Sequence, residues 1–244
     1  MWRGLSAAAL LQAWERAAGR PAVERALVLL HCADPARPLD ELRRLPIGAR
    51  DAALFEVRAA TFGPQIAGHA LCPACGARLE YGFDTRDLVS LPAARDGEPF
   101  TASIDGYTLR LRVPDSDALA KACAGGDVDG ARQRLLQHCV IAAEHEGASI
   151  AAGELAEGVH LAAMQAIAAH DPRADLTLAM DCRECGHAWS LVFDIVSFFG
   201  DEIAAYASQL LIDVDRLARA YGWREDDILA MSPLRRQSYL QLVG

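Results

Sequence analysis

Two short cysteine motifs, far apart in the chain, constrain its fold more than any other feature. The first motif is Cys72-Pro-Ala-Cys75-Gly, and the second is Cys182-Arg-Glu-Cys185-Gly. Two residues between the cysteines let one tight turn direct both sulfurs toward one ion, and the glycine after the second cysteine permits a positive φ angle. Each motif is typical of half of a tetrahedral four-thiolate metal site. We therefore predict that these four cysteines bind one Zn2+ jointly, and the sequence leaves iron open as the metal in the cell.

Similar sequences come after the two motifs, which indicates a structural repeat. Residues 72–84 align with residues 182–194 without a gap, and both segments end in Phe-Asp. Apolar side chains alternate with other residues behind each motif, and a period of two predicts a half-buried strand. We expect the two strands to share one sheet around the metal, as a zinc ribbon split by a long insertion. The matched Asp84 and Asp194 favour matched structural roles, such as ending a strand or capping the next element, over a catalytic carboxylate pair.

Paired cysteines can also form a disulfide, form a redox site or belong to an apolar core. A disulfide framework is typical of short secreted chains, whereas this chain has 244 residues and we expect no signal peptide. A thioredoxin-like motif opens a helix, whereas each motif here opens a predicted strand. His187 could replace one thiolate, although four thiolates already complete the coordination of zinc. The remaining Cys32, Cys123 and Cys139 lie in apolar helical patterns, and we expect them to be buried as small hydrophobic residues.

The composition indicates a globular protein with a sizeable core. Hydrophobic residues make up 52% of the chain, and the formal net charge is −9. The acidic balance argues against nucleic acid as a partner, because phosphate binding usually requires a basic face. No uninterrupted apolar run reaches the roughly 18 residues needed to cross a bilayer, so we expect no membrane segment. A reducing cytoplasm is the expected location, since it preserves thiolate ligands.

Apolar periodicity and turn residues predict an α+β fold in which helices flank the split zinc-ribbon-like unit. Asp105-Gly106 predicts the turn of a β-hairpin over residues 101–113, after a loop over residues 92–99. The apolar stripe that ends at Gly222 predicts a long C-terminal helix. The expected helices cover residues 5–19, 21–31, 50–62, 115–124, 131–143, 154–169 and 197–221, with short helices after Trp223 and Ser232.

These elements divide the chain into three expected segments. The first is an N-terminal helical segment over residues 1–64. The second, over residues 65–198, is the split zinc-ribbon β unit with a helical insertion at about 115–170. The third comprises the C-terminal helices of residues 199–244.

Two groups of charged residues could take part in ligand binding. Arg50, Asp51 and Arg58 lie on one amphipathic helix, where they could form a ligand pocket, although a solvated face or a local ion pair is more common for such charges. Arg110 and Arg112 lie on one face of the predicted hairpin, where they could face an anion or simply be exposed sheet charges.

The segment over residues 45–90 combines several motifs. It carries Leu45-Pro-Ile-Gly-x-Arg-Asp51, a helix that ends at Phe62-Gly63, the Cys-Pro-x-Cys-Gly motif and a strand with an acidic end. This combination resembles the baseplate hub assembly proteins of contractile-tailed phages, whose relatives occur in gene clusters for phage-tail-like contractile injection systems. The resemblance implies a small assembly chaperone or minor baseplate component, with baseplate or tail-hub proteins as partners. The full second cysteine motif and the long C-terminal extension depart from that pattern, and they leave open whether the protein stays in the particle.

Three functions remain as hypotheses. The preferred one is a zinc-stabilised assembly or structural protein of a contractile phage-tail-like baseplate, which acts by protein–protein recognition and is cytoplasmic or incorporated into a tail-like particle. The alternative is a zinc-ribbon module associated with nucleic acid or transcription, which the acidic charge disfavours. The third is an enzyme. A four-thiolate site has no open position for water, and the chain has no recognisable nucleophile–base motif, so we predict no catalytic residue and no enzyme activity.

Overall fold

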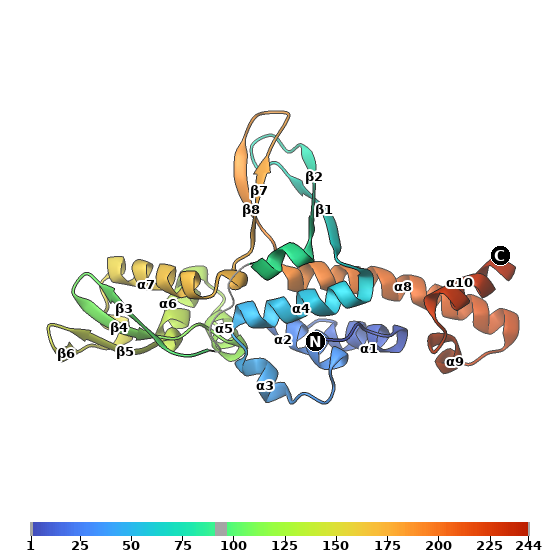
Figure 1. Ribbon diagram of the computed structural model, residues 1–244, viewed down its shortest axis with the longest axis horizontal. Helices are drawn as coiled ribbons and strands as arrows, with labels where there is room; N and C mark the ends of the chain where they lie inside the picture. The colour runs from blue at the N-terminus through green and yellow to red at the C-terminus, as the bar shows by residue number, and fades with distance from the viewer. Residues whose placement is uncertain (1, 91–96, 244) are drawn as a thin grey trace.

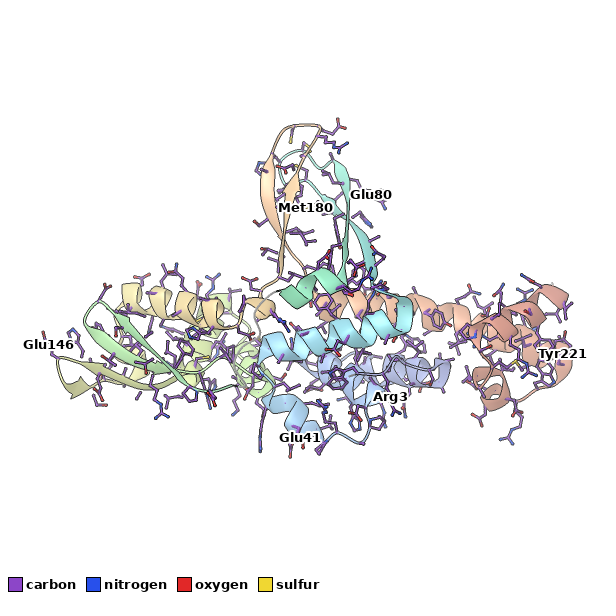
Figure 2. The ribbon with its side chains drawn as sticks, viewed as in Figure 1. Arg3, Glu41, Glu80, Glu146, Met180 and Tyr221 are labelled. Carbon is purple, nitrogen blue, oxygen red and sulfur yellow. The ribbon has the colours of Figure 1, made fainter. Side chains whose placement is uncertain are left out.

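The computed structural model describes residues 2–90 and 97–243 of the chain, and residues 92–96 of the expected loop lie outside this part. Within it the protein is α+β, as the sequence predicts. Three projections extend from a central layer of helices (Figure 1). We call them the stalk, made of two β-hairpins, the sheet arm, made of a four-stranded sheet and its helices, and the C-terminal arm. Glu80 lies on the stalk, Glu146 at the tip of the sheet arm and Tyr221 in the C-terminal arm (Figure 2).

The central layer consists of the N-terminal helices and the first half of a long C-terminal helix. Its members are α1 (Ala7–Ala17), α2 (Ala22–Ala33), α3 (Leu39–Arg44), α4 (Ile47–Phe62) and α8 (Ile195–Tyr221). The Ser6 hydroxyl accepts a hydrogen bond from the Ala9 amide and so caps α1. Apolar stripes on these helices meet in one core, in which Leu30, Leu54 and Phe199 are fully buried. The predicted helices of this layer are confirmed.

The long helix α8 connects the central layer to the C-terminal arm. By length and composition alone it also qualifies as a membrane-spanning helix, which the uninterrupted apolar runs of the sequence did not predict. Most of its apolar side chains, however, form one stripe on which Phe199, Ile203 and Leu210 are buried against other helices, although Leu211 and Ile212 are exposed. Asp201 and Asp215 lie among its exposed residues. This division between a buried and a polar face is that of an amphipathic core helix.

The stalk consists of two separate hairpins, so the prediction of a single shared sheet is wrong. Strands β1 (Gln65–Leu71) and β2 (Arg78–Asp84) pair antiparallel, and so do β7 (Thr177–Asp181) and β8 (Ala188–Val192). Each cysteine motif is itself the turn of its hairpin. The strand after a motif therefore pairs with the strand before the same motif, which is the nearest partner in the chain. The two β strands before the motifs complete the zinc-ribbon-like unit.

The sheet arm has its own core. Its strands β3 (Phe100–Ile104), β4 (Tyr107–Leu111), β5 (Val140–His145) and β6 (Ala148–Ser149) are adjacent in that order, and α5 (Ser116–Cys123), α6 (Val128–Cys139) and α7 (Glu157–His170) complete the arm. The hairpin around Asp105-Gly106 is confirmed. The expected helix to residue 143 instead ends at Cys139, because the next residues pair with β4. The β-branched Val140 and Ile141 favour that strand.

Short elements connect the larger ones. They are the 3-10 turns η1 (Thr85–Ser90), η2 (Ala152–Glu154) and η3 (Pro172–Ala174), and the C-terminal helices α9 (Glu225–Leu229) and α10 (Pro233–Leu242). Gly222 ends α8 in the left-handed conformation, as predicted, and the Ser232 hydroxyl caps α10. Buried Leu217, Ile228 and Leu240 form the small core of the C-terminal arm.

The sheet arm joins the central layer at the start of α4, within the Leu45–Asp51 motif. The Ile47 amide donates to the Pro114 carbonyl at 3.0 Å, and the Gly48 amide donates to the Asp171 carboxylate at 2.8 Å. A Cβ atom at Gly48 would collide with the Asp171 carboxylate and crowd the Arg173 Cβ atom, so a larger residue at this position would displace the Asp171 side chain. The segment between β4 and α5 and the residue after α7 therefore contact the same helix start, and Asp171 caps α4 from 123 residues away.

We expect Asp171→Ala to lower the free energy of unfolding by about 1–2 kcal/mol, the usual effect of removing an N-terminal cap. Asp171 is 1% exposed, so water does not replace the lost acceptor. Asp171→Asn keeps an oxygen acceptor and should lose less. Chemical denaturation of the two variants beside the unchanged protein measures both effects. Equal losses in the two variants would contradict the capping role.

Arg50 and Arg58 are buried, so the expectation that they lie on a solvated helix face is wrong. Arg50 is 4% exposed and forms an ion pair of 2.7 Å with the adjacent Asp51. The alternative prediction of a local ion pair is therefore confirmed. Burial is the main cause that raises the pKa of Asp51 to about 6, although Arg50 acts to lower it. Arg58 is also 4% exposed, and its guanidinium binds both carboxylate oxygens of Glu202, at 2.9 and 2.6 Å. Arg58 therefore ties α4 to α8.

Candidate metal centre

The four predicted cysteines come together at the tip of the stalk. The sulfur of Cys72 lies 3.7 Å from that of Cys185, and the sulfur of Cys75 lies 3.6 Å from that of Cys182. All four sulfurs lie within 4.8 Å of one another. Four sulfurs about 2.3 Å from one tetrahedral ion are separated by about 3.8 Å. The sulfur cluster therefore has the size that a four-thiolate Zn2+ site requires.

The two turns that hold the cysteines have the same conformation. The Cys72 amide donates to the Ala77 carbonyl at 2.8 Å, and the Cys182 amide donates to the His187 carbonyl at 2.9 Å. In each turn a glycine follows the second cysteine, and its φ angle is 75° in the first turn and 73° in the second. The amide of this glycine donates a hydrogen bond to the carbonyl of the first cysteine. The first cysteine of each turn is buried, and the second is exposed. Each first cysteine faces the second of the other turn, so the halves are related by an approximate twofold axis.

The thiols of the cluster differ in their tendency to ionise when no cation is present. Burial acts to raise the pKa of Cys72, but the amides of Ala74 and Cys75 donate to its sulfur, and its pKa falls to about 7. The Ala77 amide acts to lower the pKa of Cys75, but the neighbouring thiols and burial raise it to about 12. Four adjacent thiolates repel one another, whereas a divalent cation removes that repulsion and displaces the protons. The donor set therefore suits a soft or borderline metal cation.

The remaining cysteines and His187 lie outside this cluster. His187 stacks against Trp189, with ring centroids 5.9 Å apart, and does not belong to the group of metal-binding side chains. Cys32 and Cys139 are buried, as predicted. Cys123 is exposed, which contradicts its expected burial. It is the last residue of α5, where the helix end faces solvent.

The matched residues at the ends of the two hairpins have matched roles, as the repeat predicts. Asp84 accepts a hydrogen bond from the Arg86 amide at 2.8 Å, and Asp194 accepts one from the Val196 amide at 2.9 Å. Each aspartate thus caps the helical element after its hairpin. Phe83 and Phe193 pack edge to face, with ring centroids 5.1 Å apart. The stalk is therefore fixed at its base by aromatic packing and at its tip by the cysteines. Sequence reasoning missed the contact between the two phenylalanines, although their equal offset from the motifs was visible.

The two arginines on the hairpin of the sheet arm, Arg110 and Arg112, face solvent. Arg110 and Arg112 are both exposed, in agreement with the interpretation as sheet charges. Arg112 donates to the His138 carbonyl at 2.8 Å, near the C-terminal end of α6. A cation is favourable there because the last carbonyls of a helix carry partial negative charge. Arg112 therefore has a structural contact with the end of α6.

A metal ion bound by the four cysteines could cross-link the two hairpins, but it would have no free coordination position for a substrate. Four protein ligands complete a tetrahedral coordination sphere, and a catalytic zinc instead keeps a position for water. In the described residues, this is the only group of cysteine, histidine and acidic side chains placed to share a metal ion. The site is therefore of the structural class.

The four cysteines at the tip of the two-hairpin stalk have the donor set of a structural rather than a catalytic metal site. A sequence profile described as "T4 bacteriophage base plate protein" matches residues 26–200. This match covers most of the chain, so the protein belongs to the family of T4 bacteriophage base plate proteins. The matched part includes both hairpins and the sheet arm, whereas α9 and α10 lie beyond it. No curated protein and no solved structure matches the chain.

Proposed function

We propose that this protein is a zinc-stabilised assembly or structural component of a contractile phage-tail-like baseplate. It binds other baseplate or tail-hub proteins, and it catalyses no reaction. The observation that carries the proposal is the sulfur tetrahedron at the tip of the stalk, which lies inside the segment matched by the baseplate family. The finer placement, among hub assembly proteins, rests on the motifs of residues 45–90.

The zinc has a structural purpose in this proposal. The two hairpins have no strand pairing with each other, so the metal joins their tips across more than 100 residues of sequence. Closing a long loop removes much conformational entropy from the unfolded chain. Thiolate–zinc binding is worth on the order of 10 kcal/mol in small domains at neutral pH. Zn2+ supplies no chemistry beyond this cross-link, and Cys72, Cys75, Cys182 and Cys185 hold it.

We expect protein purified without added metal to contain about one equivalent of Zn2+, because the four cysteines form one tetrahedral site. Elemental analysis and native mass spectrometry measure the metal and its stoichiometry. Iron in place of zinc would change the identity of the metal but not the site. Two equivalents, or no metal in protein that is folded, would overturn the shared site.

Binding to baseplate proteins is tested separately. The full-length protein is co-expressed with the products of the genes beside its own, and complexes are isolated by affinity to a tag on this chain. We expect a stable complex with at least one baseplate or tail-hub protein. If the folded, zinc-loaded protein forms none, the assembly role fails although the metal site stands.

A further inference from the structure

The space between the two hairpins is a cleft with two unpaired strand edges. Strands β2 and β7 line it along residues 77–82 and 177–181, and its volume is about 890 Å3. Glu80 and Met180 lie on the two hairpins that border this space (Figure 2). The base of the stalk is closed by the Phe83–Phe193 contact and its tip by the cysteine cluster. The cleft is therefore framed at both ends and open along its length.

The hydrogen-bond pattern of each hairpin shows which backbone groups face outward. The Cys72–Ala77 bond and the bond from the Thr85 amide to the Pro64 carbonyl mark the hydrogen-bonded pairs of the first hairpin. Because such pairs alternate in an antiparallel ladder, the backbone groups of the residues between them point away from β1. On β2 these residues are Arg78, Glu80, Gly82 and Asp84, and the first three of them line the cleft.

The same reasoning applies to the second hairpin. The Cys182–His187 bond and the bond from the Phe193 amide to the Leu176 carbonyl fix its alternation. The residues with outward backbone groups on β7 are Thr177, Ala179 and Asp181. No hydrogen bond connects them to β2, since the two hairpins are separate sheets. Two rows of unpaired amides and carbonyls therefore border one cleft.

The charged side chains that line the cleft are also unpartnered. They are Arg78, Glu80, Asp181, Arg183 and Glu184, and none makes an ion pair or a side-chain hydrogen bond within the described residues. All five lie in the half of the cleft toward the cysteine tip. The half toward the base carries Gly82, Thr177 and Leu178, which are uncharged. The cleft thus complements a segment with charged residues at one end and uncharged residues at the other.

We propose that this cleft binds an extended polypeptide segment of a partner protein, which adds to β7 as a further strand, because the outward residues Thr177 and Ala179 of β7 are uncharged whereas Arg78 and Glu80 protect the edge of β2. This step rests on the proposed role in protein recognition and names its site. Main-chain hydrogen bonds to an exposed edge provide affinity, and the side chains of the cleft select the sequence. Edge strands otherwise pair without specificity, and the charges near the tip protect this edge from such pairing.

The hairpin offers a matched pair of variants, because Ala179 and Ser190 are opposite each other in the β7–β8 ladder. Both are exposed, and both have outward amides that take no part in the hairpin. Proline at either position removes one outward amide and is compatible with an edge strand. Only Ala179 lines the cleft. Ala179→Pro is therefore the test, and Ser190→Pro is the control for damage to the hairpin.

The probe is a library of random 12-residue peptides, selected for binding to the full-length, zinc-loaded protein. We expect selected peptides to bind Ala179→Pro at least about tenfold more weakly, and Ser190→Pro almost unchanged. Amide hydrogen exchange should slow at the outward residues of β7 when peptide is bound. Metal content is measured for each variant, so a lost metal site is distinguished from a lost cleft.

Three outcomes would overturn the proposal. The first is that the selection yields no binder whose exchange protection falls in the stalk. The second is that peptides bind both proline variants equally well while both retain zinc. The third is that the same amides become protected without peptide as protein concentration rises, which would make the occupant a second copy of this chain.

Discussion

Cys75→Ser should lower the melting temperature by about 10 °C. Loss of one thiolate from a four-thiolate site removes several of the roughly 10 kcal/mol that zinc binding provides. For a chain of this size, each 1 kcal/mol shifts the melting temperature by about 2–4 °C. The sulfur of Cys75 faces that of Cys182 in the other hairpin, so its loss weakens the link between the hairpins. Thermal melting monitored by circular dichroism measures the change.

The position of the first proteolytic cuts gives this prediction a second measurement. Because the hairpins are separate sheets joined at their tips, limited proteolysis of Cys75→Ser should cut first within residues 65–84 or 177–192. Cys123→Ser is the matched control, since Cys123 is exposed and lies outside the cluster. It should melt like the unchanged protein. Equal melting of all three proteins would rule out a structural role for the metal.

Arg58→Ala should lower the free energy of unfolding by about 3–5 kcal/mol, because it breaks a buried ion pair and leaves one partner behind. Arg58 donates to both oxygens of Glu202 and also to the Gly63 and Gln65 carbonyls. The change thus removes the contact that joins α4, α8 and the start of β1. Chemical denaturation measures the loss. A loss below about 1 kcal/mol would show that the pair contributes little.

Two further variants separate the cause of this loss from a general effect of removing arginine. Arg219→Ala removes an exposed arginine that pairs with Asp215 one turn away, and it should have no measurable effect. The double variant Arg58→Met with Glu202→Leu removes both charges together. It should recover part of the stability, since no buried charge is then left without its partner. The Gly63 and Gln65 carbonyls still lack their donor, so recovery should be incomplete.

The clustering of the four cysteines was predictable because its signal is local. Two residues between cysteines and a glycine after them define the turn that each motif forms, whatever surrounds it. The caps at Asp84 and Asp194 were predictable for the same reason, since each contacts an amide two residues away. The helices with clear apolar stripes and the Asp105-Gly106 hairpin also depend on neighbouring residues.

The features that sequence reasoning missed depend on residues far apart in the chain. Arg58 has the pattern of a surface charge, and only Glu202, 144 residues later, makes its burial favourable. Gly48 has no local reason to be glycine, because the atom that would collide with a side chain belongs to Asp171. The prediction of strand pairing was wrong because it overlooked a partner that is close in the sequence. The repeat suggested pairing between halves, whereas the turn within each half already provides a partner.

The continuous helix α8 sets the distance between the base of the stalk and the C-terminal arm. The helix begins at the base of the stalk, where Asp194 caps it, and continues without interruption for 27 residues to Tyr221. At 1.5 Å per residue it is about 40 Å long. The family profile ends at residue 200, near the start of this helix. An uninterrupted helix resists bending, so α8 fixes the distance between the base of the stalk and the C-terminal helices α9 and α10.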